Sequence, residues 1–577
     1  MKHSSRITPS SALAAVLMDE LSRCGVGDVV ISPGARSAPL AQAAYAHPRL
    51  RHHVRFDERS AGFLALGLTK GHGRPVPVIC TSGTAAANLH PAVLEAAHSR
   101  LPLVILTADR PPELRGTGAN QSTDQIKLYG HAVMYFAEVG PPELREGNNA
   151  YWRTLVCRAL RAARAGPAHL NIALRDPLDF DCPTGPPSAL AGRADGRPWT
   201  RLGDEAGQQQ PVELDTARRG LVVAGDGIAD PHSVVAFAEA ANWPLLAEPY
   251  SNARYGPNAI STYQDLLSHP PTRARLMPES VLVVGRTGLS HELLGLYGSA
   301  VTHTVVDAHP QWADPTRTAD LLLCALPRAR KAADPDWLEA WKDAEKTART
   351  ALHDHLDQAA LSEPRAVRDV LRLIPHDSLC LIGASMPIRD ADRTMAPRRG
   401  PRIIANRGLS GIDGAVSTAI GAALAHQDGR AFAILGDLSL LHDANGLMIG
   451  PNQPRPDLTI IVINNDGGGI FSLVDHTCEA VGFEALFGTP HNVCIADLAS
   501  AVNWRYSSIT SMEDLPAFLA EPGPLIIEIR TERAANAAFH HQLRRYIHTA
   551  LERTQFRTAC DGPSAPKAEE TSTQGTA

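Results

Sequence analysis

The sequence lacks the features that mark a membrane protein, a disulfide-rich protein or a nucleic-acid-binding protein. No apolar run approaches the roughly 18 residues that a helix needs to cross a bilayer. The nine cysteines include no Cys-x-x-Cys pair, so neither a zinc site nor a disulfide framework is predicted. A net charge of −6 argues against a nucleic-acid or anionic-membrane surface. The N-terminal stretch has no signal-peptide hydrophobic core, and we expect a cytoplasmic protein.

Alternating apolar runs and helical patterns predict an α/β protein built from three doubly wound, parallel-sheet domains. A chain of 577 residues is too long for one hydrophobic core. Short apolar runs bounded by turn residues are typical of buried strands in parallel sheets. We expect strands at 28–32, 76–80, 103–107 and 169–174, then at 220–224, 280–284 and 303–306, and finally at 378–382, 402–405, 431–435, 458–463 and 525–529.

Composition suggests where the domains begin and end. Residues 181–216 are rich in Pro, Gly, Gln and Ala, as interdomain linkers are, and residues 334–370 form a charged helical stretch. After about residue 558 the chain has almost no apolar content, which predicts disorder. We therefore expect domains at 1–180, 217–333 and 334–557, a linker at 181–216 and a disordered tail at 558–577.

The stretch from residue 430 to residue 471 carries the strongest functional signal. It contains two apolar runs, of which the first stops at Gly436-Asp437 and the second at an Asn-Asn pair followed by three glycines. With a crossover helix over 439–448, both runs end at one sheet edge, where open α/β sheets bind ligands. A carboxylate, an amide oxygen and a backbone carbonyl suit a hard cation, and glycine turns let N–H groups approach phosphate. The alternative is an ordinary strand–turn–helix in which Asp437 caps the helix.

A Gly-Asp-Gly sequence at 225–227 also follows an expected strand, the one at 220–224. At the matching distance downstream there is only Asn252, with no Asn-Asn pair and no strand before it. We interpret this sequence as a plain strand-to-helix turn.

The 430–471 stretch resembles the diphosphate-binding motif of thiamine diphosphate enzymes. Six stretches are similar to those of the 2-succinyl-5-enolpyruvyl-6-hydroxy-3-cyclohexene-1-carboxylate (SEPHCHC) synthases of menaquinone and phylloquinone biosynthesis: SPGARSAPL, FDERSAGFLALGL, TSGTAAANLHPAV, LTADRPPELRGTGANQ, NRGLSGIDG and NNDGGGIFSLV. The similarity is clear in the first and third domains and weak in the middle one. It implies pyrimidine-binding, central and diphosphate-binding domains, thiamine diphosphate with Mg²⁺ or Mn²⁺, and a homodimer or homotetramer.

The resemblance also implies a reaction. SEPHCHC synthases are transferases that decarboxylate 2-oxoglutarate and add the succinyl carbanion equivalent to isochorismate in Michael fashion, giving SEPHCHC and CO₂. One alternative is a different thiamine-dependent 2-oxo acid decarboxylase or carboligase, and another is a catalytically silent thiamine diphosphate-binding protein. Arginines beyond the expected strand ends favour the SEPHCHC synthase reaction over these alternatives. Guanidinium pairs bidentately with carboxylates, and 2-oxoglutarate and isochorismate carry two carboxylates each.

Carried over residue by residue, the resemblance assigns a cofactor site. Asp437, the side chain of Asn465 and the carbonyl of Gly467 would hold the metal, and Glu58 would bond to N1′ of the aminopyrimidine. Glu58 taken alone is equally an acidic residue in a first helical turn, where the helix dipole favours it. The other expected cofactor contacts are Ser82, Gly83, Gln121, Ile412, Gly436, Leu438, Ser439, Gly468, Ile470 and Phe471.

Substrate contacts follow from the same resemblance. Ser385 and Arg389 are expected at the distal carboxylate of 2-oxoglutarate. Each arginine alone is also a common residue of exposed turns. The residues expected at isochorismate and the reacting centre are Arg36, Arg110 and Gln121, with Arg407 in the same pocket.

Two further features of the expected pocket each have two possible interpretations from the sequence. Ile412, Ile470, Phe471 and Val474 would form a dry wall around the cofactor, but apolar residues like these also serve in ordinary cores. His291 stands at or next to the position where related enzymes carry Lys or Arg toward the isochorismate carboxylate. A protonated imidazole would serve there, and the alternative is a histidine that faces solvent.

Overall fold

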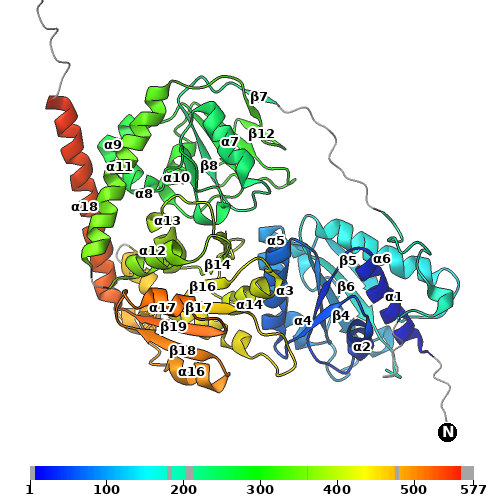
Figure 1. The fold of residues 1–577 in the computed structure, drawn as a ribbon. Helices are drawn as coiled ribbons and strands as arrows, with labels where there is room; N and C mark the ends of the chain where they lie inside the picture. The colour runs from blue at the N-terminus through cyan, green and yellow to red at the C-terminus, as the bar shows by residue number, and fades with distance from the viewer. Residues whose placement is uncertain (1–6, 179–184, 202–211, 360, 475–479, 561–577) are drawn as a thin grey trace, which may run out of the picture.

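The computed structural model describes residues 7–178, 185–201, 212–359, 361–474 and 480–560, which form three parallel α/β sheets with helices on both faces (Figure 1). This confirms the predicted fold class. The described residues contain no helix that is long and apolar enough to span a membrane.

The first sheet has the order β2-β1-β3-β4-β6-β5. Its strands are β1 (Asp28–Ile31), β2 (Arg51–Val54), β3 (Val76–Cys80), β4 (Leu103–Asp109), β5 (Tyr135–Val139) and β6 (Ala168–Ala173). Its helices are α1 (Pro9–Arg23), α2 (Ala38–Ala46), α3 (Glu58–His72), α4 (Thr84–Asn88), α5 (His90–Ser99) and α6 (Asn148–Ala163).

The middle sheet has the order β12-β11-β10-β8-β9. Its strands are β8 (Gly220–Ala224), β9 (Leu245–Ala247), β10 (Ser280–Val284), β11 (Thr302–Val306) and β12 (Leu321–Leu323). Its helices are α7 (Pro231–Ala241), α8 (Tyr263–Ser268), α9 (Pro270–Arg275) and α10 (His291–Tyr297). A separate two-stranded sheet pairs β7 (Glu213–Leu214), inside the expected linker, with β13 (Arg328–Ala329).

The third sheet has the order β15-β14-β16-β17-β19-β18. Its strands are β14 (Leu379–Ile382), β15 (Arg402–Ile404), β16 (Ala431–Gly436), β17 (Leu458–Asn464), β18 (Arg505–Ile509) and β19 (Leu525–Arg530). Its helices are α12 (Glu363–Leu373), α13 (Met386–Thr394), α14 (Ala415–Ala425), α15 (Asp437–His442), α16 (Ile495–Ala501) and α17 (Leu515–Ala520). Two longer helices, α11 (Pro335–Gln358) and α18 (Arg533–Cys560), flank this part of the chain.

The central strands are apolar because helices cover both faces of each sheet. All seven residues of β17 and all seven of β4 are buried. Burying a large aliphatic side chain contributes about 1.5–3 kcal/mol, so these runs supply much of the driving force for folding. The sequence predicted both runs to within two residues at each end.

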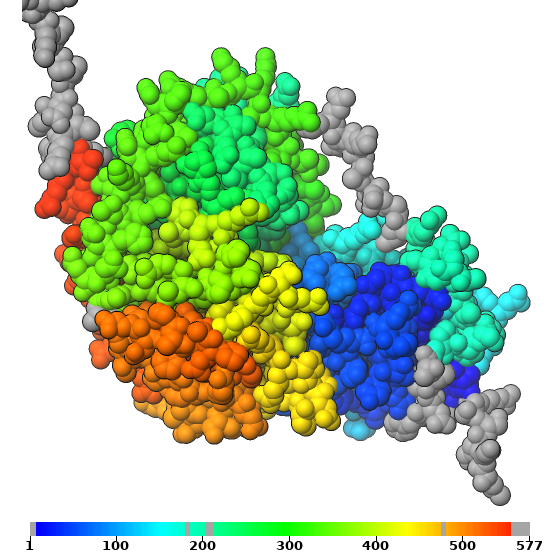
Figure 2. All heavy atoms as spheres, viewed as in Figure 1, coloured from blue at the N-terminus to red at the C-terminus, as the bar shows by residue number. Residues whose placement is uncertain are grey.

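Helices α3 and α14 join the first and third sheets through a close backbone contact. A Cβ atom at Gly67 would lie 2.1 Å from the carbonyl oxygen of Thr418, and one at Gly421 would lie 2.1 Å from that of Leu64. Glycine is therefore required at both positions. Apolar side chains of both helices and both sheets form one continuous core. Figure 2 shows the blue N-terminal region meeting the yellow segment that contains α14.

Two predicted helices differ from the structure. The crossover helix expected at 439–448 is instead α15 followed by a 3₁₀ turn at Ala444–Leu447. Asp443 separates them, because its Oδ2 accepts a hydrogen bond from the Ser417 amide (2.6 Å) in the first turn of α14. The charged stretch expected at 334–370 is two helices, α11 and α12.

The last helix, α18, runs beside α11, and both pack against the middle sheet (Figure 1). It includes the first three residues of the tail expected at 558–577, and residues 561–577 lie outside the described part of the chain. Residues 181–184 and 202–211 of the expected linker also lie outside it.

Candidate active site

Asp437 and Asn465 follow two neighbouring parallel strands, as predicted. Gly436 at the end of β16 is in register with Ile463 of β17, so both side chains lie at one carboxyl edge. Asp437 is 2% exposed; its Oδ1 accepts from the Leu438 amide (2.6 Å) and its Oδ2 from the Gly467 amide (2.9 Å). Burial raises the pKa of Asp437. A buried carboxylate at this edge of the sheet is suited to binding a cation.

Asn465 supplies the second oxygen. Its Nδ2 donates to Oε1 of Glu363 (2.8 Å), whereas its Oδ1 is buried and has no hydrogen-bond partner in the described chain. Leaving such an acceptor unpaired costs about 1–3 kcal/mol unless a ligand satisfies it. The donor set therefore fits a hard divalent cation, which prefers carboxylate and amide oxygens.

These residues line a cavity of about 440 Å³. Most of the residues that the sequence placed in the diphosphate-binding and donor parts of the site are here: Ser385, Arg389, Arg407, Ile412, Gly436, Asp437, Leu438, Ser439, Asn465, Gly467, Gly468, Ile470 and Phe471. Ile412 and Ile470 are only partly buried, and Phe471 is 38% exposed. This incomplete burial is expected of cavity walls rather than of core side chains.

In the part of the chain that the structure describes, two arginines in this cavity have no carboxylate partner. Arg389, one turn into α13, donates from Nη1 to the Ser385 carbonyl (2.7 Å). The Arg407 guanidinium lies over the Tyr250 ring at 5.5 Å, and its buried Nε has no partner among the described residues. Burial, and second the charge of Arg407, lower the pKa of Arg389. Two unpaired cations held this close together are suited to an anionic ligand.

Ser385 shows backbone strain at the same place. It directly precedes α13 and has a backbone φ of +71°, a conformation that residues other than glycine rarely adopt. Such residues cost of order 1–3 kcal/mol and are concentrated at functional sites. Ser385 was predicted at the donor substrate, and its backbone holds the N-terminus of α13 against the cavity.

A second polar cluster occupies the carboxyl edge of the first sheet. Ser82 donates to the Gln121 carbonyl (2.9 Å) and accepts from Nη1 of Arg110 (2.6 Å). Gln121 returns a hydrogen bond from Nε2 to the Ser82 carbonyl (3.0 Å). Burial, and second the charge of Arg36, lower the pKa of Arg110. The structure thus brings together Arg36, Arg110, Ser82 and Gln121, with Gly83 next in the chain.

Glu58 is the first residue of α3, as expected. Asp57 caps the helix by accepting from the Arg59 amide (2.9 Å). The Glu58 side chain is half-buried, and burial raises its pKa. Arg59 donates to the His442 carbonyl (2.7 Å), which ties the start of α3 to α15.

The two clusters do not share a cavity within one chain. The residues that line the 440 Å³ cavity come from the middle and third sheets and none from the first. Phe56, two residues before Glu58, is 60% exposed. Within the first-sheet cluster, Arg36, Ser82 and Arg110 are buried, whereas Gln121 is exposed.

Comparison with known proteins identifies the family. The model of the thiamine pyrophosphate enzyme N-terminal TPP binding domain matches residues 12–128, and that of the C-terminal TPP binding domain matches residues 386–529. A 2-succinyl-5-enolpyruvyl-6-hydroxy-3-cyclohexene-1-carboxylate synthase of Thermobifida fusca is 51% identical, over 94% of this chain and 100% of the relative. The chain belongs to the SEPHCHC synthase family. Synthases of Saccharopolyspora erythraea (44% identical; 94% of this chain, 100% of the relative) and Chloroflexus aurantiacus (39%; 94% and 97%) agree.

In this member of the SEPHCHC synthase family, two of the predicted substrate residues, His291 and Val474, are not among the residues that line the main cavity. His291 is exposed at the start of α10 and lines a cavity of about 160 Å³ with Met386 and Arg389, both of which also line the larger cavity. Val474 is 48% exposed and is not among the residues that line the larger cavity. The substrate contacts of both residues stay predictions.

Sequence reasoning missed three residues that the fold brings to these clusters. Glu363 begins α12 and contacts Asn465; burial and then the charge of Asp390 raise its pKa to about 7. His491 has its Nε2 3.3 Å from Oδ2 of Asp437. Gln125 accepts from the Gly83 amide (2.9 Å). None belongs to a motif, and only the tertiary structure brings them to the site.

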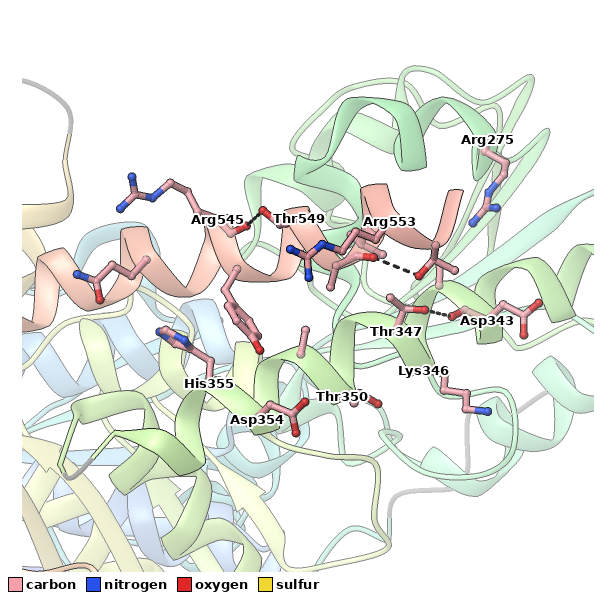
Figure 3. Close-up of a pocket in the computed structure, with 17 residues that line it drawn as sticks. Arg275, Asp343, Lys346, Thr347, Thr350, Asp354, His355, Arg545, Thr549 and Arg553 are labelled. Carbon is pink, nitrogen blue, oxygen red and sulfur yellow. Dashed lines mark hydrogen bonds between the residues drawn. The ribbon is translucent and has the colours of Figure 1, made fainter. Parts of the chain in front are cut away.

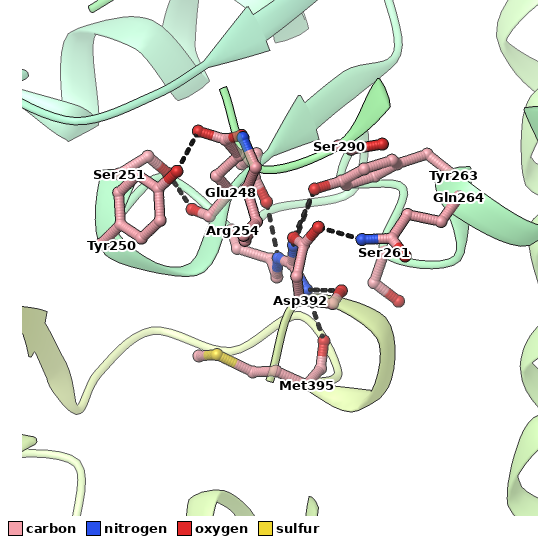
Figure 4. A network of polar contacts seen from close by, with 12 residues as sticks. Glu248, Tyr250, Ser251, Arg254, Ser261, Tyr263, Gln264, Ser290, Asp392 and Met395 are labelled. Atoms are coloured by element: carbon pink, nitrogen blue, oxygen red, sulfur yellow. Dashed lines mark hydrogen bonds and ion pairs between the residues drawn. The ribbon is translucent and has the colours of Figure 1, made fainter. Parts of the chain in front are cut away.

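The middle domain supports the cavity through a buried polar network (Figure 4). Glu248 accepts from the Leu289 amide (2.8 Å), the Gly288 amide (3.2 Å) and the Tyr250 hydroxyl (2.6 Å). Gly288 lines the cavity, and Tyr250 lies under Arg407. Burial raises the pKa of Glu248 to about 7. The network also contains Arg254, Tyr263 and Gln264, each bonded to Asp392 of α13.

A large groove and a possible metal cluster elsewhere in the described chain are weaker candidates for the active site. A groove of about 1120 Å³ between α11 and α18 is lined by charges of both signs and by none of the predicted site residues (Figure 3). Among the described residues, Glu20, Cys24 and Cys157 form a possible metal cluster. Glu20 is already paired with Arg153 (2.7 Å) and accepts from the Trp199 amide (2.5 Å), so its oxygens are satisfied by the protein.

Proposed function

We propose that this chain is a thiamine diphosphate- and Mg²⁺-dependent transferase (Mn²⁺ serving as an alternative metal) that converts 2-oxoglutarate and isochorismate into SEPHCHC and CO₂ in menaquinone biosynthesis. The observation that carries the proposal is the cavity in which an unpaired amide oxygen and a buried carboxylate share the walls with two unpaired arginines. The names of the relatives support the same reaction.

The metal and diphosphate would be held at the third sheet. Asp437, Oδ1 of Asn465 and the Gly467 carbonyl are the proposed metal ligands, and the glycine-rich turn at 467–469 lets the backbone approach the diphosphate closely. When bound, thiamine diphosphate supplies the carbanion chemistry of decarboxylation and Michael addition. Partly buried Ile412, Ile470 and Phe471 exclude water from the reacting centre.

Glu58 would hold a proton at N1′ of the aminopyrimidine. Its raised pKa suits this role, because burial favours the protonated carboxyl, which can share its proton with a ring nitrogen. Since Glu58 does not line the cavity of its own chain, we propose that a second copy supplies it. A homodimer is then the smallest active unit, and a tetramer of two such dimers is compatible with this arrangement.

Different arginines would bind the carboxylates of the two substrates. Arg389 and Ser385 are placed to hold the distal carboxylate of 2-oxoglutarate, with Arg407 beside them. Arg36, Arg110 and Gln121, at the first sheet, would face isochorismate across the dimer. Each charge-assisted pair between guanidinium and carboxylate contributes about 1.5–3 kcal/mol.

The test is an assay with 2-oxoglutarate, isochorismate, Mg²⁺ and thiamine diphosphate that follows isochorismate loss and product mass. We expect loss of isochorismate coupled to one equivalent of CO₂, and no turnover without the cofactor. Release of CO₂ with isochorismate untouched would indicate another decarboxylase or carboligase. Cofactor binding without any CO₂ release would indicate a silent binding protein.

A further inference from the structure

The two side-chain amides of the Asn-Asn pair at the end of β17 each donate a hydrogen bond to a glutamate. Nδ2 of Asn464 donates to Oε1 of Glu528 (2.6 Å), and Nδ2 of Asn465 donates to Oε1 of Glu363 (2.8 Å). Glu528 is 0% exposed and Glu363 is 1% exposed. Each amide nitrogen is thus held by a buried glutamate that is distant in sequence.

The two amide oxygens differ. Oδ1 of Asn464 accepts from the backbone amide of Asp466 (3.0 Å), so this side chain closes a turn. Oδ1 of Asn465 is buried and has no partner in the described chain. An amide has one donor end and one acceptor end, so fixing the nitrogen also fixes the direction of the oxygen. Only the second amide presents a fixed, unused oxygen.

Glu363 is suited to hold that direction. Its Oε1 receives two donors, Nδ2 of Asn465 and the Thr531 hydroxyl (3.0 Å), and therefore acts as an acceptor whether or not Oε2 carries a proton. An acceptor at this point excludes the flipped amide, which would set oxygen against oxygen. Glu363 also lines the cavity, so it borders the place where the cation would bind.

We propose that Glu363 is a positioning residue for the metal: it holds the Asn465 amide with Oδ1 directed toward the cation held by Asp437. The inference rests on the proposed metal–diphosphate site and adds a residue that does not itself touch the cation. Partners of metal ligands of this kind typically change metal affinity by about 10- to 100-fold when they are removed.

Glu363→Met tests the proposal, because methionine has a similar length and no acceptor oxygen. Glu528→Met is the matched control, since it removes the same kind of bond from Asn464. The measurement is Mg²⁺ titration at saturating thiamine diphosphate, followed by calorimetry, with the melting temperature of each metal-free protein recorded alongside. We expect Glu363→Met to weaken Mg²⁺ binding by about tenfold or more and Glu528→Met to change it by less than about threefold, although both lower the metal-free melting temperature.

Glu363→Gln keeps the polarity of the site and gives a second comparison that applies even if Glu363→Met does not fold. Glutamine can present either its oxygen or its nitrogen to Asn465, so the amide is held less firmly. We expect a smaller loss of Mg²⁺ affinity than in Glu363→Met, and none in Glu528→Gln.

Unchanged Mg²⁺ affinity in the Glu363 variants would overturn the inference. Equal losses in the Glu363 and Glu528 variants would overturn it too, because the effect would then be general damage to the core. If the unaltered protein showed no Mg²⁺-dependent cofactor binding, the proposed function itself would fail, and the two failures are therefore distinguishable.

Discussion

The first and third sheets have the same winding but carry different chemistry at the same edge. Numbered within each domain, both have the strand order 2-1-3-4-6-5. The third and fourth strands of the third sheet end at Asp437 and Asn465, which offer oxygen atoms. The corresponding strands of the first sheet end at Ser82 and Arg110, which offer donors. The fold supplies the edge, and the residues after the strands decide the ligand.

The middle sheet extends this comparison. Its order, 2-1-3-4-5, places β8 and β10 where β14 and β16 lie in the third sheet. The Gly-Asp-Gly sequence at 225–227 follows β8, whereas Asp437 follows β16, so the two aspartates occupy different positions of the winding. Asp226 is paired with Arg286 through the side chains and through two backbone hydrogen bonds (2.7 and 2.8 Å). The similar sequence at Asp226 therefore has a structural role.

The largest expected effect separates these two aspartates. Asp437→Ala should abolish Mg²⁺-dependent retention of thiamine diphosphate, because it removes the only full negative charge among the proposed ligands; the loss should exceed the roughly 10- to 100-fold typical of indirect partners. Asp226→Ala, the control, should leave retention unchanged. Calorimetric titration measures both, and unchanged affinity in Asp437→Ala would place the metal elsewhere.

The next effect distinguishes binding from turnover. Glu58→Gln should lower kcat by about 10²-fold or more, since it removes acid–base assistance, while thiamine diphosphate affinity stays within about threefold. Asp57→Asn is the control, because it alters the neighbouring carboxylate that caps the same helix. Steady-state kinetics and cofactor titration decide the matter. Unaltered kcat in Glu58→Gln would remove this residue from the catalytic group.

The arginines of the two sheets should affect different substrates. Arg389→Ala should raise KM for 2-oxoglutarate by roughly ten- to a hundredfold, the loss of one charge-assisted pair, and change KM for isochorismate much less. Arg110→Ala should show the opposite preference. Initial rates at varied concentrations of each substrate test the division. If both variants raised both KM values equally, the assignment of one substrate to each sheet would be wrong.

The smallest effect concerns the contact that joins the two sheets. Gly67→Ala should destabilise the protein by about 1–3 kcal/mol, because the added Cβ would overlap the Thr418 carbonyl oxygen of α14. Gly140→Ala, where a Cβ meets nothing within 4 Å, is the control and should be nearly neutral. Thermal unfolding followed by circular dichroism compares them. Equal melting temperatures would show that α3 and α14 can separate at little cost.

The sequence predicted the buried central strands well and missed most of the edge strands, although it placed β15, an edge of the third sheet, to within one residue. β3, β8, β10, β16 and β17 are apolar runs covered on both faces, and they lie where expected. The strands β2, β5 and β18 are sheet edges with partly exposed, mixed sequences such as Arg-His-His-Val, so no apolar run marked them. The hydrophobic pattern reports burial, and edge strands are only half-buried.

The same limit applies to the site. Asp437 and Asn465 could be recognised because each stands directly after a strand in a readable motif. Glu363 precedes Asn465 by 102 residues, and His491 lies beyond the turn that follows β17, so sequence spacing does not relate them to the metal ligands. Tertiary structure can bring residues that orient a ligand from any part of the chain. No local sequence pattern predicts such residues.

The bridge between Asp226 and Arg286 has a consequence for protein engineering. A Cβ at Gly225 would lie 2.2 Å from the Arg286 carbonyl oxygen, so the protein's own backbone fills the space between the ends of β8 and β10. One ion pair and a two-residue bridge keep this place closed. In the middle sheet the protein itself therefore engages the aspartate of the Gly-Asp-Gly sequence. Asp226 and Arg286 also line a groove of about 930 Å³, and a designer seeking a new binding site in this chain would start by replacing these two side chains.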